Sequence, residues 1–154
     1  MKNKKNSLVF VWIIVFSFLS FNVFSNEISF EAENIETSGE DFISASKNIV
    51  ITDKFGNKIY GDKLLIDNIK KIYTITENVK VENISNSIVI NADEIEYDQK
   101  NSIINTVGKT KLNKNNNYFI EGSDIFFNQK KGDIYSEKKS VITDFLNNFI
   151  EIEN

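Results

Sequence analysis

The most constraining feature of this sequence is a repeat of about thirty residues in which apolar and polar positions alternate. A small residue recurs at positions 32, 61, 92 and 122, at spacings of 29, 31 and 30 residues. Apolar residues alternate on both sides of it, which is the period of a β-strand with one buried face. After the small residue, however, the next apolar position comes three residues later. This change of parity predicts a bulge or a sharp bend, which Gly or Ala permits.

Each of these strands is followed by a polar cluster, a second alternating strand and another polar connection. Short connections at both ends predict antiparallel neighbours, because a parallel pair needs a crossover of about a dozen residues or more. We therefore predict an all-β fold, an antiparallel repeat meander with one apolar face. It spans residues 26–154 as one domain of four repeats, with 147–154 as the start of a fifth. In the fourth repeat the alternation places Tyr135, Glu137, Val141 and Thr143 inward, with Glu137 as a departure from the apolar pattern.

Residues 1–25 have the pattern of a signal peptide. Lys2, Lys4 and Lys5 form a basic start, residues 8–24 are mostly apolar, and a cleavage pattern ends at Ser25. The alternative is an uncleaved anchor, because seventeen apolar residues reach the lower limit for spanning a bilayer. Both interpretations predict export. The absence of Cys excludes a disulfide framework and an acylated lipoprotein terminus.

Composition argues against catalysis and against nucleic acid as a partner. The chain has no His and no Cys, and all 18 of its basic residues are lysine, so His- or Cys-dependent nucleophiles and ordinary zinc sites are excluded. Outside residues 1–25, 15 lysines face 22 acidic residues, a charge of about −7 that is unsuited to a phosphate backbone. Asp62 and Asp93 recur with the repeat, which favours a structural role. We predict no enzyme activity, no catalytic residue, no metal and no cofactor.

The repeat motif itself resembles a known family. The best copies are residues 91–101, which begin Asn-Ala-Asp-Glu-Ile, and residues 60–64, Tyr-Gly-Asp-Lys-Leu. A partial Gly-Asn-Val element follows, as in Asn78-Val79. Four such copies in register, from about Ile28 onward, resemble the OstA-like domain. This is the periplasmic β-jellyroll shared by LptA, LptC and the amino-terminal region of LptD.

The resemblance implies a sheet folded like a taco that carries lipopolysaccharide toward the outer membrane. Lipid A acyl chains would lie in an apolar slit, and OstA-like domains would join through edge strands, near residues 28–35 and 149–153. It implies a periplasmic location, associated with the outer membrane if a barrel follows. The slit candidates are Ile59, Leu64, Ile66, Ile75, Val79, Ile90, Ala92, Ile95, Tyr97, Leu112, Ile120, Ile125 and Phe127.

Three questions stay open at this point. The first question is which member of the family the chain resembles. Because the sequence stops within a fifth repeat, a truncated LptD amino terminus is the first interpretation, a stand-alone LptA-like protein the second and LptC the third. The inward rows could also be a closed core, since apolar alternation usually reflects packing. A repeat β-solenoid surface protein or adhesin without lipid transport is the alternative function. Because the charge outside residues 1–25 is negative, the sequence does not identify any lysine as a ligand for the lipid A phosphates.

Overall fold

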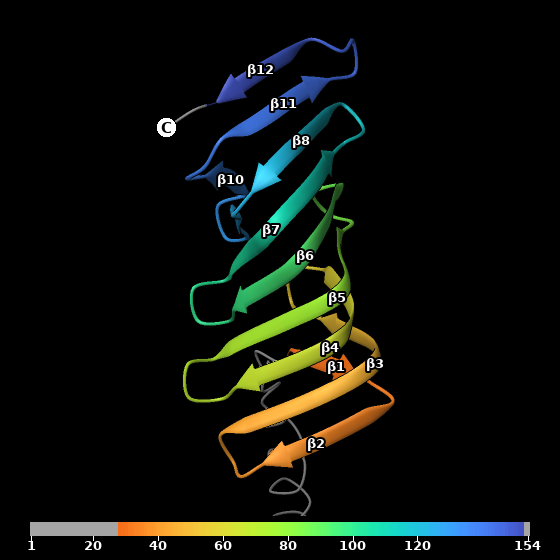
Figure 1. The fold of residues 1–154 in the computed structure, drawn as a ribbon, viewed down its shortest axis with the longest axis vertical. Helices are drawn as coiled ribbons and strands as arrows, with labels where there is room; N and C mark the ends of the chain where they lie inside the picture. The colour runs from red at the N-terminus through yellow and green to blue at the C-terminus, as the bar shows by residue number, and fades with distance from the viewer. Residues whose placement is uncertain (1–27, 153–154) are drawn as a thin grey trace, which may run out of the picture.

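The computed structural model describes residues 28–152, which form one antiparallel sheet of 12 strands without a helix (Figure 1). The predicted all-β fold is confirmed. The predicted signal peptide lies outside the described residues. The strands are β1 Ser29–Glu31, β2 Asn34–Ser38, β3 Phe42–Thr52, β4 Asn57–Asp67, β5 Ile72–Asn83, β6 Ile88–Asp98, β7 Ile103–Lys114, β8 Tyr118–Ser123, β9 Ile125–Asn128, β10 Asp133–Ser136, β11 Ser140–Asp144 and β12 Phe149–Ile152.

The five long strands, β3 to β7, are each divided into two halves by an irregularity in pairing. The register shifts between β3 and β4, β4 and β5, β5 and β6, and β6 and β7. At these points the backbone takes positive φ values, in Lys47–Asn48, Glu77–Asn78 and Gly108. A bulge is therefore present at the predicted level, but its additional residue lies in the second strand of each of the first three repeats, opposite the recurring acidic residue, and not in the strand that carries the small residue.

The two sets of half-strands form two wings that face each other. Wing A contains residues 42–46, 63–67, 72–76, 94–98 and 103–107 together with β2, β9 and β10, whereas wing B contains 49–52, 57–61, 79–83, 88–92 and 109–114 together with β1, β8, β11 and β12. Inward side chains from both wings belong to one hydrophobic core. The sheet is thus folded over itself, with the bend on one side and two rows of turns, here called the mouth, on the other (Figure 1).

The recurring small residue is required because another side chain occupies the space beside it. A Cβ atom added to Gly61 would lie 2.4 Å from Cγ2 of Ile75, which belongs to wing A. At Gly122 an added Cβ would lie 2.7 Å from Oγ of Ser140. The small residues thus let side chains at the bend approach the backbone of wing B.

The acidic residue next to the small one holds the bulge of a neighbouring strand. Oδ2 of Asp93 accepts the backbone N–H of Lys109 at 2.9 Å, and Oδ2 of Asp62 accepts the amide of Asn78 at 2.5 Å. Glu33 makes the equivalent contact with Asn48. Asp62 and Asp93 therefore recur for a structural reason, as the sequence indicated.

The last repeat differs from the predicted meander. β11 pairs with β8 rather than with β10, and exposed Glu137 lies in the break between β10 and β11. The predicted inward parity is wrong here by one residue. Ile134 packs against the core, whereas the ring of Tyr135 stacks on Phe126 on the outer side of wing A, 5.0 Å between centroids. The described sheet also has two edge strands at each end, whereas the sequence predicted one. They are β1 and β2 at the amino-terminal end and β10 and β12 at the carboxy-terminal end.

Gly61→Ala should destabilise the domain by about 1–3 kcal/mol, because the new methyl group overlaps Ile75 while the backbone at Gly61 has no positive φ. Ile75→Ala removes the overlapping carbon but should itself cost about 2–5 kcal/mol. The double variant should then be less destabilised than the sum of the two single variants. Urea unfolding of all four proteins measures this. If the two losses of stability were strictly additive, the contact with Ile75 would not explain why residue 61 is glycine.

Candidate lipid-binding interior and mouth

One inward residue from each strand of wing B contributes to an unbroken apolar row across the sheet. Each is the direct pairing partner of the next. The row consists of Phe30, Ile51, Ile59, Val81, Ile90, Leu112, Ile120, Ile142 and Ile150. Its exposure rises from 0% at Ile90 to 2% at Leu112 and 65% at Ile150, with Ile120 and Ile142 half-buried.

Wing A presents two rows toward this one. One contains Ile35, Ala45, Leu64, Ile75, Ile95 and Thr106, and the other contains Ile43, Ile66, Tyr73, Tyr97, Ile104, Phe127 and Ile134. The first row emerges at the β2 edge, where Ile35 is 53% exposed. Both wings therefore carry apolar inward side chains to the ends of the folded sheet.

The structure brings the predicted slit residues into this interior. Eleven of them are at most 3% exposed: Ile59, Leu64, Ile66, Ile75, Val79, Ile90, Ile95, Tyr97, Leu112, Ile125 and Phe127. Ala92 and Ile120 are partly buried and pack against the same core. Between the ends, the two wings are in direct contact. Lipid binding by these residues remains a prediction.

Sequence reasoning missed the exposed end of the interior. β10 is the last strand of wing A, whereas wing B continues through β11 and β12 (Figure 1). Ile120, Ile125, Ile134 and Ile142 line a recess of about 60 Å³ at this end. Ile142 was missed because the inward positions of the fourth repeat were placed from Tyr135 onward. Counting from Ile134, the partner of inward Phe127, gives Ile142 as an inward residue.

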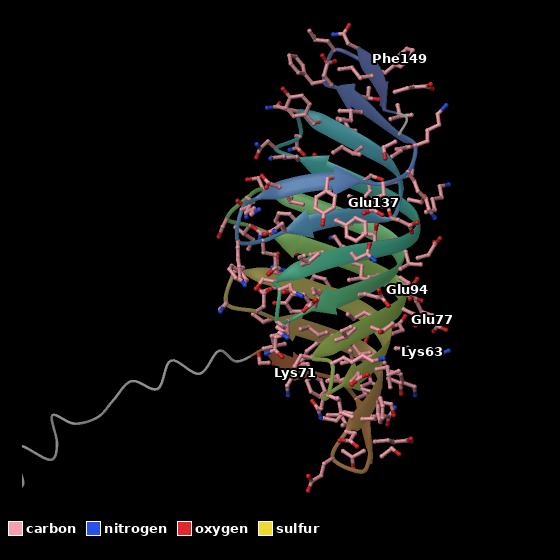
Figure 2. All side chains as sticks on the ribbon, turned by 90° about the vertical axis from the view of Figure 1, so that its left-hand side faces the viewer. Lys63, Lys71, Glu77, Glu94, Glu137 and Phe149 are labelled. Carbon is pink, nitrogen blue, oxygen red and sulfur yellow. The ribbon has the colours of Figure 1, made fainter. Side chains whose placement is uncertain are left out.

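Exposed apolar side chains surround this end of wing B. Phe145, Leu146, Phe149 and Ile150 are 65–70% exposed. Figure 2 shows Phe149 at the extreme end of the molecule. Exposed apolar surface of this kind marks interaction sites more often than solvent-facing structure.

The wing B side of the mouth contains a buried polar network. Oδ1 of Asp53 accepts the N–H groups of Phe55 (2.8 Å) and Asn57 (3.0 Å), and Oδ2 accepts the Asn57 amide (2.7 Å). Oδ1 of Asn57 accepts the amide of Asn83 at 2.7 Å. Asp53, Asn57 and Asn83 are at most 6% exposed. These bonds satisfy Asp53 internally and connect adjacent turns.

The wing A turns repeat one arrangement and stack on each other. Oδ1 of Asp67, Asp98 or Asn128 accepts the N–H of the residue three positions on, at 2.9, 2.9 and 3.1 Å. The bond from Lys70 N–H is the main reason that the pKa of Asp67 lies below its ordinary value. Gln99 N–H donates to the Lys71 carbonyl, and Gln129 N–H to the Ser102 carbonyl, both at 3.0 Å. The turns therefore hold their side chains at regular intervals along the mouth.

Tyr97 connects the interior to the mouth. Its ring is 2% exposed and lies 6.0 Å from the ring of Tyr73, measured between centroids. Burial, with a smaller contribution from the Asp53 carboxylate, raises the pKa of its hydroxyl far above the ordinary value.

The described residues hold no cluster of three or more metal-ligating side chains, and the same part of the chain contains no helix able to span a membrane.

Comparisons with known proteins agree with this architecture at the level of fold. No family model and no curated protein matches the sequence. Among solved structures, LptH from Pseudomonas aeruginosa matches with a TM-score of 0.63 over 84% of this chain and 96% of LptH, at 12% identity. It is described as the LptA-homologous periplasmic component of the conserved lipopolysaccharide transport device. The chain has the fold of LptH. The predicted jellyroll of the OstA-like type is thereby confirmed as a fold.

Asn57→Ala should destabilise the domain by about 1–3 kcal/mol, because it leaves buried Asp53 Oδ2 and the Asn83 amide without their shared partner. Asn113→Ala is the matched control, since Asn113 makes a comparable turn bond with Asn116 in an exposed position. It should cost less than about 1 kcal/mol. Equal losses in denaturant midpoint for both variants would contradict a special role for the buried network.

Proposed function

We propose that this domain binds lipopolysaccharide and takes part in its transport across the periplasm. Lipid A acyl chains would lie between the two wings, against the inward rows. The unbroken apolar row of wing B, which is most exposed where wing A ends, is the observation that carries the proposal. The fold shared with LptH supports it independently.

Acyl chains would enter at the exposed end of the interior. There, Ile142 and Ile150 face no strand of wing A, and the recess beside Ile120 leads toward the buried part of the row. Transfer of an acyl chain to such a surface gains about 0.8 kcal/mol per buried CH₂ group. Deeper entry requires the wings to separate, because the inward side chains between the ends already pack against each other.

A photo-crosslinking amino acid at Ile142 should capture lipopolysaccharide, whereas one at Val141 should not. Adjacent residues in a strand point to opposite faces. Val141 pairs with Glu121 in the outer row, and Ile142 pairs with Ile120 in the inner row. Immunoblots of irradiated protein mixed with purified lipopolysaccharide measure the adduct. Equal capture at both positions, or capture at Val141 alone, would contradict binding along the inner row.

The same free end supports a proposal about assembly. β12 pairs only with β11 among the described strands, so its outer edge has unpaired backbone groups, and such edges associate readily. Exposed Ile150, the last member of the inner row, would continue the apolar row into a partner. We propose that another OstA-like domain pairs with β12, which would extend the lipid-binding surface without exposing it to water.

Glu151→Pro should block this pairing and leave the domain folded. Asp144 N–H donates to the Asn148 carbonyl (2.9 Å), and hydrogen-bonded positions alternate along antiparallel strands. By this alternation the Ile150 N–H faces β11, whereas the N–H groups of Phe149 and Glu151 face the free edge. Sedimentation at increasing concentration should show association for the unmodified protein and its loss in Glu151→Pro.

Glu151→Ala is the control, because it removes the ion pair with Lys139 but keeps the backbone N–H. It should associate like the unmodified protein. Association that survives Glu151→Pro would exclude this edge as the contact.

The resemblance to LptD adds a finer proposal, in which the domain precedes an outer-membrane barrel and delivers lipopolysaccharide to it. An LptA-like role between membranes is the second possibility, and both use the same interior. The interpretation of residues 1–25 as a signal peptide remains a prediction, and it fits the periplasmic setting of either role.

A further inference from the structure

Three lysines from successive wing A turns converge on one pocket at the mouth. Lys71, Lys100 and Lys130 line a cavity of about 410 Å³ together with Tyr97 and Asp53. The lysines recur at spacings of 29 and 30 residues, one in each stacked turn. Figure 2 shows Lys71 well apart from Lys63, Glu77 and Glu94, which lie together at one margin of the view.

None of these three lysines makes an ion pair within the described residues. The same is true of other described lysines, such as Lys47, Lys114 and Lys131, but Lys71, Lys100 and Lys130 line one pocket. Ion pairs in the described region involve Lys63, Lys70, Lys80, Lys111, Lys138 and Lys139. A weak bond of 3.5 Å from Lys130 Nζ to the Lys100 carbonyl holds two of the turns together without neutralising either charge.

The acidic residue that lines the pocket, Asp53, does not neutralise these lysines. Asp53 is 6% exposed, and both of its oxygens are used by Phe55 and Asn57. Lys54 also lines the pocket, and its Nζ lies 5.3 Å from the centroid of the Phe55 ring. The pocket therefore combines an excess of cationic groups with a carboxylate that is already satisfied.

A buried amide beside the pocket is only partly satisfied. The side chain of Gln129 is 7% exposed, and neither Oε1 nor Nε2 has a partner in good hydrogen-bonding geometry among the described residues. It interacts with the Tyr97 hydroxyl, which lines the pocket, and this interaction opposes the rise in the pKa of that hydroxyl. Buried polar groups are usually well hydrogen-bonded, and a bound ligand is one explanation for a group that is not.

We propose that this pocket is the site for a phosphate group on the headgroup of the bound amphiphile. The proposal rests on the proposed function, because Tyr97 joins the pocket to the interior that would hold the acyl chains. Lysine is a point-charge ligand for phosphate, and three such groups around one pocket suit a phosphate monoester. The overall negative charge does not prevent this, since exposed charges are screened beyond about 8 Å at physiological ionic strength.

The test compares a mouth variant, Lys71→Gln/Lys100→Gln/Lys130→Gln, with an outer-face variant, Lys63→Gln/Lys80→Gln/Lys111→Gln, that loses the same charge. Each protein is titrated with fluorescent bisphosphorylated lipid A and with the same lipid after enzymatic dephosphorylation. The mouth variant should bind the phosphorylated lipid at least tenfold more weakly and the dephosphorylated lipid within twofold of the unmodified protein. The outer-face variant should remain within twofold for both lipids.

Competition with inorganic phosphate identifies the source of the anion. If inorganic phosphate displaces the phosphorylated lipid only at millimolar concentration, the pocket is a site for the lipid headgroup. If the protein binds inorganic phosphate stoichiometrically without lipid, the pocket is a site for a free anion and the proposal is wrong. Equal weakening by both variants would overturn the mouth site and leave lipid binding intact. If the unmodified protein bound neither lipid, the proposed function and this inference would both be wrong.

Discussion

The structure depends on the contact between the acidic residue of each repeat and the bulge of the neighbouring strand. Asp62 and Asp93 bind bulge residues whose backbone has positive φ or lies beside such a residue. Gly61 next to this contact leaves room for Ile75. Because the same arrangement recurs about every thirty residues, all long strands bend at one level. The sheet then folds into two wings instead of twisting as an open ribbon, and the inward rows meet.

The unequal lengths of the wings leave inward apolar residues uncovered at the β12 end of the described sheet. Wing A ends at β10, and wing B adds β11 and β12. Ile142 and Ile150 therefore continue the inner row without a facing strand, and their exposure reaches 65%. The same residues can serve lipid entry and the pairing of another domain.

The mouth differs from the interior because its turns are built from polar side chains. Asx-type bonds fix each turn, and backbone bonds between turns set their spacing. This regularity places Lys71, Lys100 and Lys130 around one pocket. An amphiphile with an anionic headgroup would match both regions, with its chains between the wings and its phosphate among the lysines.

The sequence by itself determined the all-β fold, the bend and the inward side of most strands. Period-two alternation specifies which face is buried, and the parity change at Gly61 and Ala92 marks the bend. Parity failed at Tyr135 and Val141, because the inward count of the fourth repeat began one residue too late, at Tyr135 instead of Ile134, the partner of inward Phe127. Only the tertiary structure decided how far each wing extends and which turns lie side by side. Those features depend on strand pairing between distant segments, such as β8 with β11, which local pattern does not encode.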